Sequence, residues 1–150
     1  MRRFKAYLPV LFWMTVIFLV STDIGSSRNT SRFIGPILRW FRADITDETI
    51  RRVQAVIRKG GHVTEYAILA LLFWRAGRVY GKENPLMQNW RWREAGWIVL
   101  WCAFYAISDE LHQSFISTRQ GNLWDVLLDS AGALIGLVGL WAIGRWKKRW

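Results

Sequence analysis

A length of 150 residues leaves room for a single domain, spanning residues 1–150, and 52% of the residues are hydrophobic. The formal net charge of +10 suits either nucleic acid or an anionic membrane surface as a counterion. Because the basic residues flank apolar runs and do not follow one face of a soluble fold, we expect membrane lipids and no nucleic acid as partners. The single cysteine, Cys102, excludes an internal disulfide and a cysteine-based zinc cluster.

The first apolar run covers residues 6–22 and contains no charged side chain. Its length lies at the lower end of the ~17–25 residues that cross a bilayer as a helix. Arg2, Arg3 and Lys5 precede it, as in a secretory signal, but no clear small-residue cleavage site follows. With further apolar runs downstream, we predict a retained first transmembrane helix.

The polar connection at residues 23–58 contains two stripes with helical spacing. The first stripe consists of Ile34, Ile37, Leu38 and Phe41, and the second of Ile50, Val53, Val56 and Ile57. Thr46 is suited to cap the second helix, and Gly60 to end it. The pattern predicts one or two short amphipathic helices on the membrane surface, with a soluble helix pair as the alternative.

Three more apolar runs follow, at residues 61–74, 92–107 and 124–143, each with polar groups at its start. Together with the first run they predict an all-α, polytopic membrane bundle of about four transmembrane helices. Basic residues before the first run, between the second and third, and after the fourth would then share the cytoplasmic side, with both termini. Residues 23–58 and 108–123 would lie outside, although the basic residues between Arg28 and Lys59 oppose this orientation.

With four crossings, polar side chains from three helices meet at one membrane face. They are Lys59, His62, Glu65 and Tyr66, then Asp109, Glu110, His112, Gln113 and Arg119, and finally Asp125 and Asp129. An ionised carboxylate inside a membrane costs about 2.5–3.5 kcal/mol on insertion scales, so such groups need partners. A structural ion-pair network explains any one of them, whereas the convergence of so many indicates a functional site.

Two chemistries fit this convergence. For acid–base catalysis the candidates are Glu65, Asp109, Glu110 and His112. For binding an anionic headgroup, Lys59, His62 and Arg119 supply positive charge, and Tyr66, Gln113, Asp125 and Asp129 complete the ligand-binding set.

A metal site is a third possibility, for which zinc or manganese would use His62, Glu65, Asp109, His112 and Asp129. Nothing in the chain resembles His-Glu-x-x-His, so we predict no metal site and assign no cofactor.

Gly132 and Gly136 form a small-xxx-small pattern in the fourth run. Such a pattern lets two helices approach closely. We expect helix packing within the chain, and a homo-oligomer through the same face as the alternative.

Two stretches of the sequence resemble a known family. They are RKGGHVTEYAIL at 58–69 and SDELHQSF at 108–115, followed by Arg119, Asp125, Asp129, Gly132 and Gly136. In order and spacing they resemble the VanZ-like family of bacterial membrane proteins, over about residues 58–139. The resemblance implies a four-helix protein of the bacterial inner membrane, and places functional residues at the polar positions of these two stretches.

The founding member of the VanZ-like family is linked to resistance to the glycopeptide teicoplanin, but the family has no established reaction. We therefore expect a cell-envelope protein that binds an anionic lipid or lipid-linked precursor at the outer face and affects glycopeptide susceptibility. Whether it is an enzyme stays open. One alternative is an enzyme acting on a phospholipid or lipid carrier, and another is a structural partner of an envelope protein.

Overall fold

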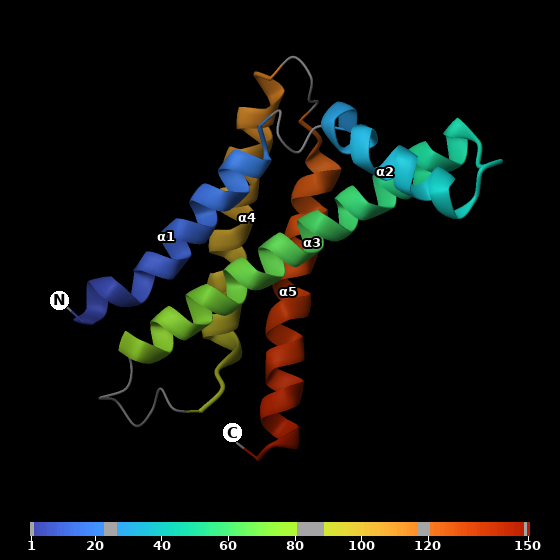
Figure 1. Cartoon of the computed structure of the whole chain (residues 1–150). Helices are drawn as coiled ribbons and strands as arrows, with labels where there is room; N and C mark the ends of the chain where they lie inside the picture. The colour runs from blue at the N-terminus through green and yellow to red at the C-terminus, as the bar shows by residue number, and fades with distance from the viewer. Residues whose placement is uncertain (1, 23–26, 81–88, 117–120, 149) are drawn as a thin grey trace.

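The computed structural model describes residues 2–22, 27–80, 89–116, 121–148 and 150, and these residues form helices without any strand (Figure 1). The helices are α1 (Arg2–Val20), α2 (Ser27–Phe41), α3 (Asp47–Tyr80), α4 (Trp92–Ser114) and α5 (Leu123–Trp146). The all-α prediction is confirmed. The third and fourth apolar runs become α4 and α5, each longer than its run because the polar residues beside the run continue the helix.

α3 and α5 make the most extensive helix–helix contact in the fold. The next most extensive contacts are those of α4 with α5 and of α1 with α3. In Figure 1, α1 and α4 run in one direction and α3 and α5 return. The buried core lies between them and includes Tyr66, Leu69, Cys102 and Leu137. The end of α4 and the start of α5 consequently lie at the same end of the bundle.

The continuity of α3 corrects one prediction, because Gly60 does not end a helix there. A glycine that terminates a helix normally adopts a positive φ, and no glycine among the described residues has one. Two mid-helix glycines cost about 1 kcal/mol each relative to alanine. The packing of the second half of α3 on α5 outweighs this cost, so Gly60 and Gly61 lie inside a helix of 34 residues.

One separate amphipathic helix therefore connects the first and second apolar runs, namely α2, and the second predicted amphipathic stripe is the first half of α3. α2 packs on that half of α3, away from the rest of the bundle (Figure 1). Phe33, Ile37, Trp40 and Phe41 of α2 remain exposed. Such an apolar surface is suited to contact with a membrane interface.

α5 is the one helix in the described ranges that is long and apolar enough to span a membrane. A shorter apolar helix covers Phe4–Val20, within α1. Only 28% of the most apolar stretch of α5 is buried, unlike the core helix of a soluble protein. The predicted bundle of four spans is thus not confirmed, because α3 and α4 carry charged residues at and beyond the ends of their apolar stretches.

A glycine contact sets the distance between α3 and α5. A Cβ added to Gly132 would lie 2.5 Å from the carbonyl oxygen of Val63, and one added to Gly136 would lie 2.9 Å from that of Ala67. Only glycine allows backbones to approach this closely. The predicted packing role of the small-xxx-small pattern is therefore confirmed within the chain.

Candidate functional site

Three helices bring polar side chains into the bundle at the end where α4 finishes and α5 starts. His62 comes from α3, Asp109 and Glu110 from the last turns of α4, and Asp129 from the second turn of α5, and all four are buried. Asp125, one turn before Asp129, is half-buried. Residues four apart on a helix share a face, so the two α5 carboxyls point to the same side.

The shortest link between α3 and α5 in this cluster joins a histidine to a carboxylate. Nδ1 of His62 lies 3.1 Å from Oδ1 of Asp129, and Asp129 is fully buried. The contact is one turn from Gly132, so the close approach of the two helices brings the pair within hydrogen-bond distance. This bond fixes the plane of the imidazole ring and directs Nε2 away from Asp129.

Asp109 has a separate set of partners. Its Oδ2 accepts hydrogen bonds from Oγ of Ser21 at 2.7 Å and from Nε2 of Gln113 at 3.0 Å, all inside the protein. Ser21 immediately follows α1, so this carboxylate ties the end of α1 to α4. The role of Ser21 could not be predicted from the sequence, since a serine at the end of an apolar run carries no signal of a distant partner.

Glu110 connects α4 to the start of α5. Its Oε2 accepts a hydrogen bond from the backbone N–H of Asn122 at 2.7 Å. Asn122 caps α5, because its side-chain oxygen accepts from the N–H of Trp124. A Cβ on Gly121 would lie 2.5 Å from the carbonyl oxygen of Glu110, so this junction requires glycine.

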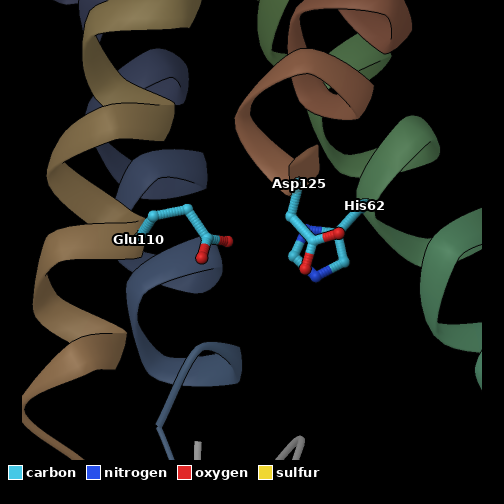
Figure 2. Close-up of side chains that lie close together, drawn as sticks. All are labelled: His62, Glu110 and Asp125. Atoms are coloured by element: carbon cyan, nitrogen blue, oxygen red, sulfur yellow. The ribbon is translucent and has the colours of Figure 1, made fainter. Parts of the chain in front are cut away.

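One donor atom each from His62, Glu110 and Asp125 lies within 4.8 Å of the other two. Figure 2 shows Glu110 extending from α4 toward the pair formed by His62 of α3 and Asp125 of α5. These residues are far apart in sequence and meet only because three helices converge.

Several buried polar atoms of the cluster have no hydrogen-bond partner among the described residues. They are the hydroxyl of Tyr66, Oδ1 of Asp109, Oε1 of Glu110 and Oδ2 of Asp129. An unsatisfied buried polar group costs about 1–3 kcal/mol, and more when it is charged. A purely structural network would not leave so many groups in this state, so the arrangement is typical of a site that receives another species.

The remaining predicted residues that the structure describes lie on α3 and α4. Glu65 is half-buried on α3, and its carbonyl oxygen accepts a hydrogen bond from the indole of Trp13. Lys59 is exposed one turn before His62. His112, a predicted acid–base candidate, stacks on Phe18 of α1 with ring centroids 4.2 Å apart. Arg119 lies outside the described residues.

The charge of the cluster is dominated by carboxylates. Four of them, Asp109, Glu110, Asp125 and Asp129, accompany a single imidazole. If all were ionised, the buried core of the site would repel an anion. An anionic ligand therefore has to bind at exposed basic side chains such as Lys59, or to a core whose charge is neutralised by protons or by a cation.

Residues 4–144 match the family described as VanZ/LLP1, which is nearly the whole chain. The chain belongs to the VanZ/LLP1 family. Membership confirms the resemblance to VanZ-like proteins and extends it beyond residues 58–139 to α1 and α2. A comparison with curated proteins and one with solved structures gave no match. Within this VanZ/LLP1 chain, the buried cluster at the α3, α4 and α5 junction is the candidate functional site.

Proposed function

We propose that this chain is a multi-spanning protein of the bacterial cytoplasmic membrane that binds the anionic headgroup of a lipid or lipid-linked cell-wall precursor. The observation that carries the proposal is a buried polar site, bordered by exposed basic residues, at one end of an apolar helix bundle. The site lies at the outer face in this proposal, with both termini in the cytoplasm.

Exposed apolar side chains on three helices support contact with lipid. α1 exposes Phe4, Leu8, Leu11 and Phe12, α4 exposes Trp97, Trp101, Phe104 and Ile107, and α5 exposes Leu127, Leu134, Ile135 and Val138. A soluble monomer rarely exposes apolar surface of this extent. The alternating directions of α1, α3, α4 and α5 also suit four crossings with the site at a single face (Figure 1).

Arg58 and Lys59 supply the positive charge for a phosphate. Both side chains are exposed on α3, four and three residues before His62, which places them on the helical face that leads to the cluster. A lipid phosphate at this rim would lie at headgroup depth while its acyl chains contact the apolar surface of the bundle. Covering a lipid-linked precursor in this way would reduce the access of a glycopeptide to it.

Native mass spectrometry of the detergent-purified chain tests the binding, with phosphatidylglycerol and phosphatidylcholine as probes. We expect preferential binding of phosphatidylglycerol. Two basic residues near a membrane surface contribute about 1 kcal/mol each, so the double variant Arg58→Gln/Lys59→Gln should bind about thirtyfold more weakly. Equal binding of both lipids by the wild-type protein would contradict the proposal.

Arg51 and Arg52 provide the matched control. They are also exposed on α3, but both bind the carboxylate of Glu48, at 2.8 and 3.0 Å, and lower its pKa. The double variant Arg51→Gln/Arg52→Gln changes the net charge equally and should leave phosphatidylglycerol binding unchanged. A comparable loss in both double variants would mean that net charge alone attracts the lipid.

Glycopeptide susceptibility tests the physiological consequence. A teicoplanin-sensitive bacterium expressing the wild-type chain should become less susceptible, and the Arg58→Gln/Lys59→Gln variant at equal membrane abundance should not protect it. Lipid binding without any change in susceptibility would retain the binding function and remove its link to glycopeptides.

The hydrogen bond between His62 and Asp129 favours a second candidate function, an enzyme acting on a phospholipid or lipid carrier. A carboxylate bonded to Nδ1 prepares Nε2 of an imidazole for proton transfer. In this case, membranes containing the wild-type chain should convert a phospholipid to a product detectable by mass spectrometry, and His62→Gln should abolish the conversion. Unchanged lipid composition in both would exclude the enzyme.

A further inference from the structure

The cluster of His62, Glu110 and Asp125 combines donor types that metal ions bind. Each residue offers one donor atom, and the three atoms lie within 4.8 Å of one another. Zinc holds nitrogen and oxygen donors about 2.0–2.2 Å away in tetrahedral geometry, which places two donors of one ion about 3.3–3.6 Å apart. Rotations of the side chains that shorten these separations by up to about 1.5 Å would therefore complete a site.

The carboxylate of Glu110 independently indicates a binding site. The residue is 95% buried, since 5% of its surface is exposed, and Oε2 is bound to the N–H of Asn122. Oε1 is buried without a hydrogen-bond partner in the part of the chain that the structure describes. The side chain extends toward His62 and Asp125 (Figure 2). Two ionised carboxylates so close together repel each other unless a cation lies between them.

The hydrogen bond of His62 to a carboxylate is the one that metal-binding histidines usually make. A histidine ligand typically donates its second ring N–H to a carboxylate, which fixes the tautomer and the ring plane. Here Asp129 occupies this position, 3.1 Å from Nδ1, and is fully buried. Nε2 is then the nitrogen that faces a metal.

We propose that His62, Glu110 and Asp125 together bind one divalent transition-metal ion, Zn²⁺ or Mn²⁺, with Asp129 orienting His62 from outside the coordination shell. An imidazole nitrogen favours these ions over Mg²⁺ and Ca²⁺, which prefer oxygen donors alone. Three protein ligands leave a coordination position open for water or for an oxygen of a ligand. We predicted no metal site from the sequence because a motif within one helix was absent. Such a motif cannot reveal metal-binding residues that come from three different helices.

The metal site goes beyond the proposed lipid binding and does not depend on it. A bound cation would offset the negative charge of the carboxylates, and its open position would suit a phosphate oxygen from a headgroup held at Arg58 and Lys59. In the alternative enzyme, Nε2 would bind the metal and would not itself take the proton.

Isothermal titration calorimetry of the full chain in detergent, treated with a chelator and then freed of it, tests the site with Zn²⁺ and Mn²⁺ alone. We expect about one ion per chain. Glu110→Gln and Asp125→Asn keep the side-chain shapes but should each weaken binding at least about tenfold. Glu94→Gln is the control, because Glu94 is an α4 carboxylate like Glu110 and half-buried like Asp125, but pairs with Arg91 outside the site.

Equal affinity in the wild-type protein and both site variants would identify adventitious surface binding and overturn the proposal. Binding of neither ion by the wild-type chain would overturn it as well. If the variants fail to fold, the wild-type chain still decides the question by NMR. Bound Mn²⁺ should broaden the amide signals of Val63 and Asn122 and leave Trp141 sharp, and the reverse pattern would place the ion elsewhere.

Lipid binding is measured on the same chelator-treated protein, with and without Zn²⁺. Loss of metal binding with retained phosphatidylglycerol binding would reject the metal site alone. Metal binding without a preference for anionic lipid would reject the proposed function alone.

Discussion

Nδ1 of His62 and Oδ1 of Asp129 lie 3.1 Å apart, across an interface where Gly132 allows the backbones of α3 and α5 to approach each other. The polar pair and the glycine contact are one helical turn apart. Helix packing and the candidate site are therefore built on the same segment, and a change in either should affect the other.

Replacing Asp129 by asparagine should destabilise the protein. The amide retains the size of the carboxyl but loses a charge-assisted hydrogen bond to His62, which we expect to lower the free energy of unfolding by about 1.5–3 kcal/mol. Thermal unfolding in detergent measures the change. Asp44→Asn, at an exposed carboxylate, is the control and should change stability by less than about 0.5 kcal/mol. Equal stability of Asp129→Asn and wild type would argue against the hydrogen bond.

Gly132→Ala should separate α3 from α5. The new Cβ would lie 2.5 Å from the carbonyl oxygen of Val63, and backbone cannot yield as a flexible side chain does. Overpacking of this kind costs about 1–3 kcal/mol. Gly139→Ala is the matched control on the same helix, because nothing lies within 4 Å of its added Cβ, and it should be neutral or stabilising. Similar melting temperatures for both variants would contradict the packing.

A test of self-association uses the same glycine face. If two chains associate through Gly132 and Gly136, exchange of both glycines for leucine should convert dimers to monomers in analytical ultracentrifugation. If instead these glycines serve only the contact with Val63 and Ala67 within one chain, the leucines should unfold the protein. Loss of folded protein, without a folded monomeric species, would argue against a dimer through this face.

Gly60→Ala and Gly61→Ala should stabilise the protein. Both glycines lie inside α3 with nothing within 4 Å of an added Cβ. Alanine in a helix interior is favoured over glycine by about 0.5–1 kcal/mol, so each substitution should raise the melting temperature. If the helix ended at Gly60, Gly60→Ala should lower the melting temperature, since alanine is disfavoured at a helix C-cap.

Membrane orientation can be measured by cysteine labelling in a Cys102→Ala background. A cysteine at the exposed Ser114, near the end of α4, should react with an impermeant maleimide in intact cells. A cysteine at Lys148, after α5, should react only once the cells are opened. The reverse pattern would place the candidate site at the cytoplasmic face.

Much of the fold follows from local patterns in the sequence. Apolar runs predicted the positions of α1, α4 and α5, and helical stripes predicted α2 and the first half of α3. The continuity of α3 was not predictable, because a glycine pair is a valid helix end until a partner such as α5 stabilises the longer helix. The four crossings stay a prediction, because one helix that is long and apolar enough to span a membrane does not establish them.

The candidate site was predictable as a set of residues but not as a set of contacts. Spacing on each helix identified His62, Asp125 and Asp129 as neighbours at one membrane face. It gave no means of choosing Asp129 as the partner of His62, or of pairing Asp109 with Ser21. Such pairings depend on the rotation and separation of helices, which Gly132 and Gly121 set through backbone contacts that leave little trace in the sequence.

The unbroken α3 also fixes the distance between its first turn and His62. From Asp47 to His62 the helix advances about 1.5 Å per residue, or roughly 22 Å in all. Because α2 packs on the first half of α3, α2 and the buried imidazole are held at a fixed separation along the α3 axis and at a fixed angle around it. Insertion of one residue in this stretch would turn α2 by about 100° relative to His62 without touching either. If α2 lies on a membrane surface as proposed, the length of α3 would thus determine the depth and the direction of the imidazole relative to that surface.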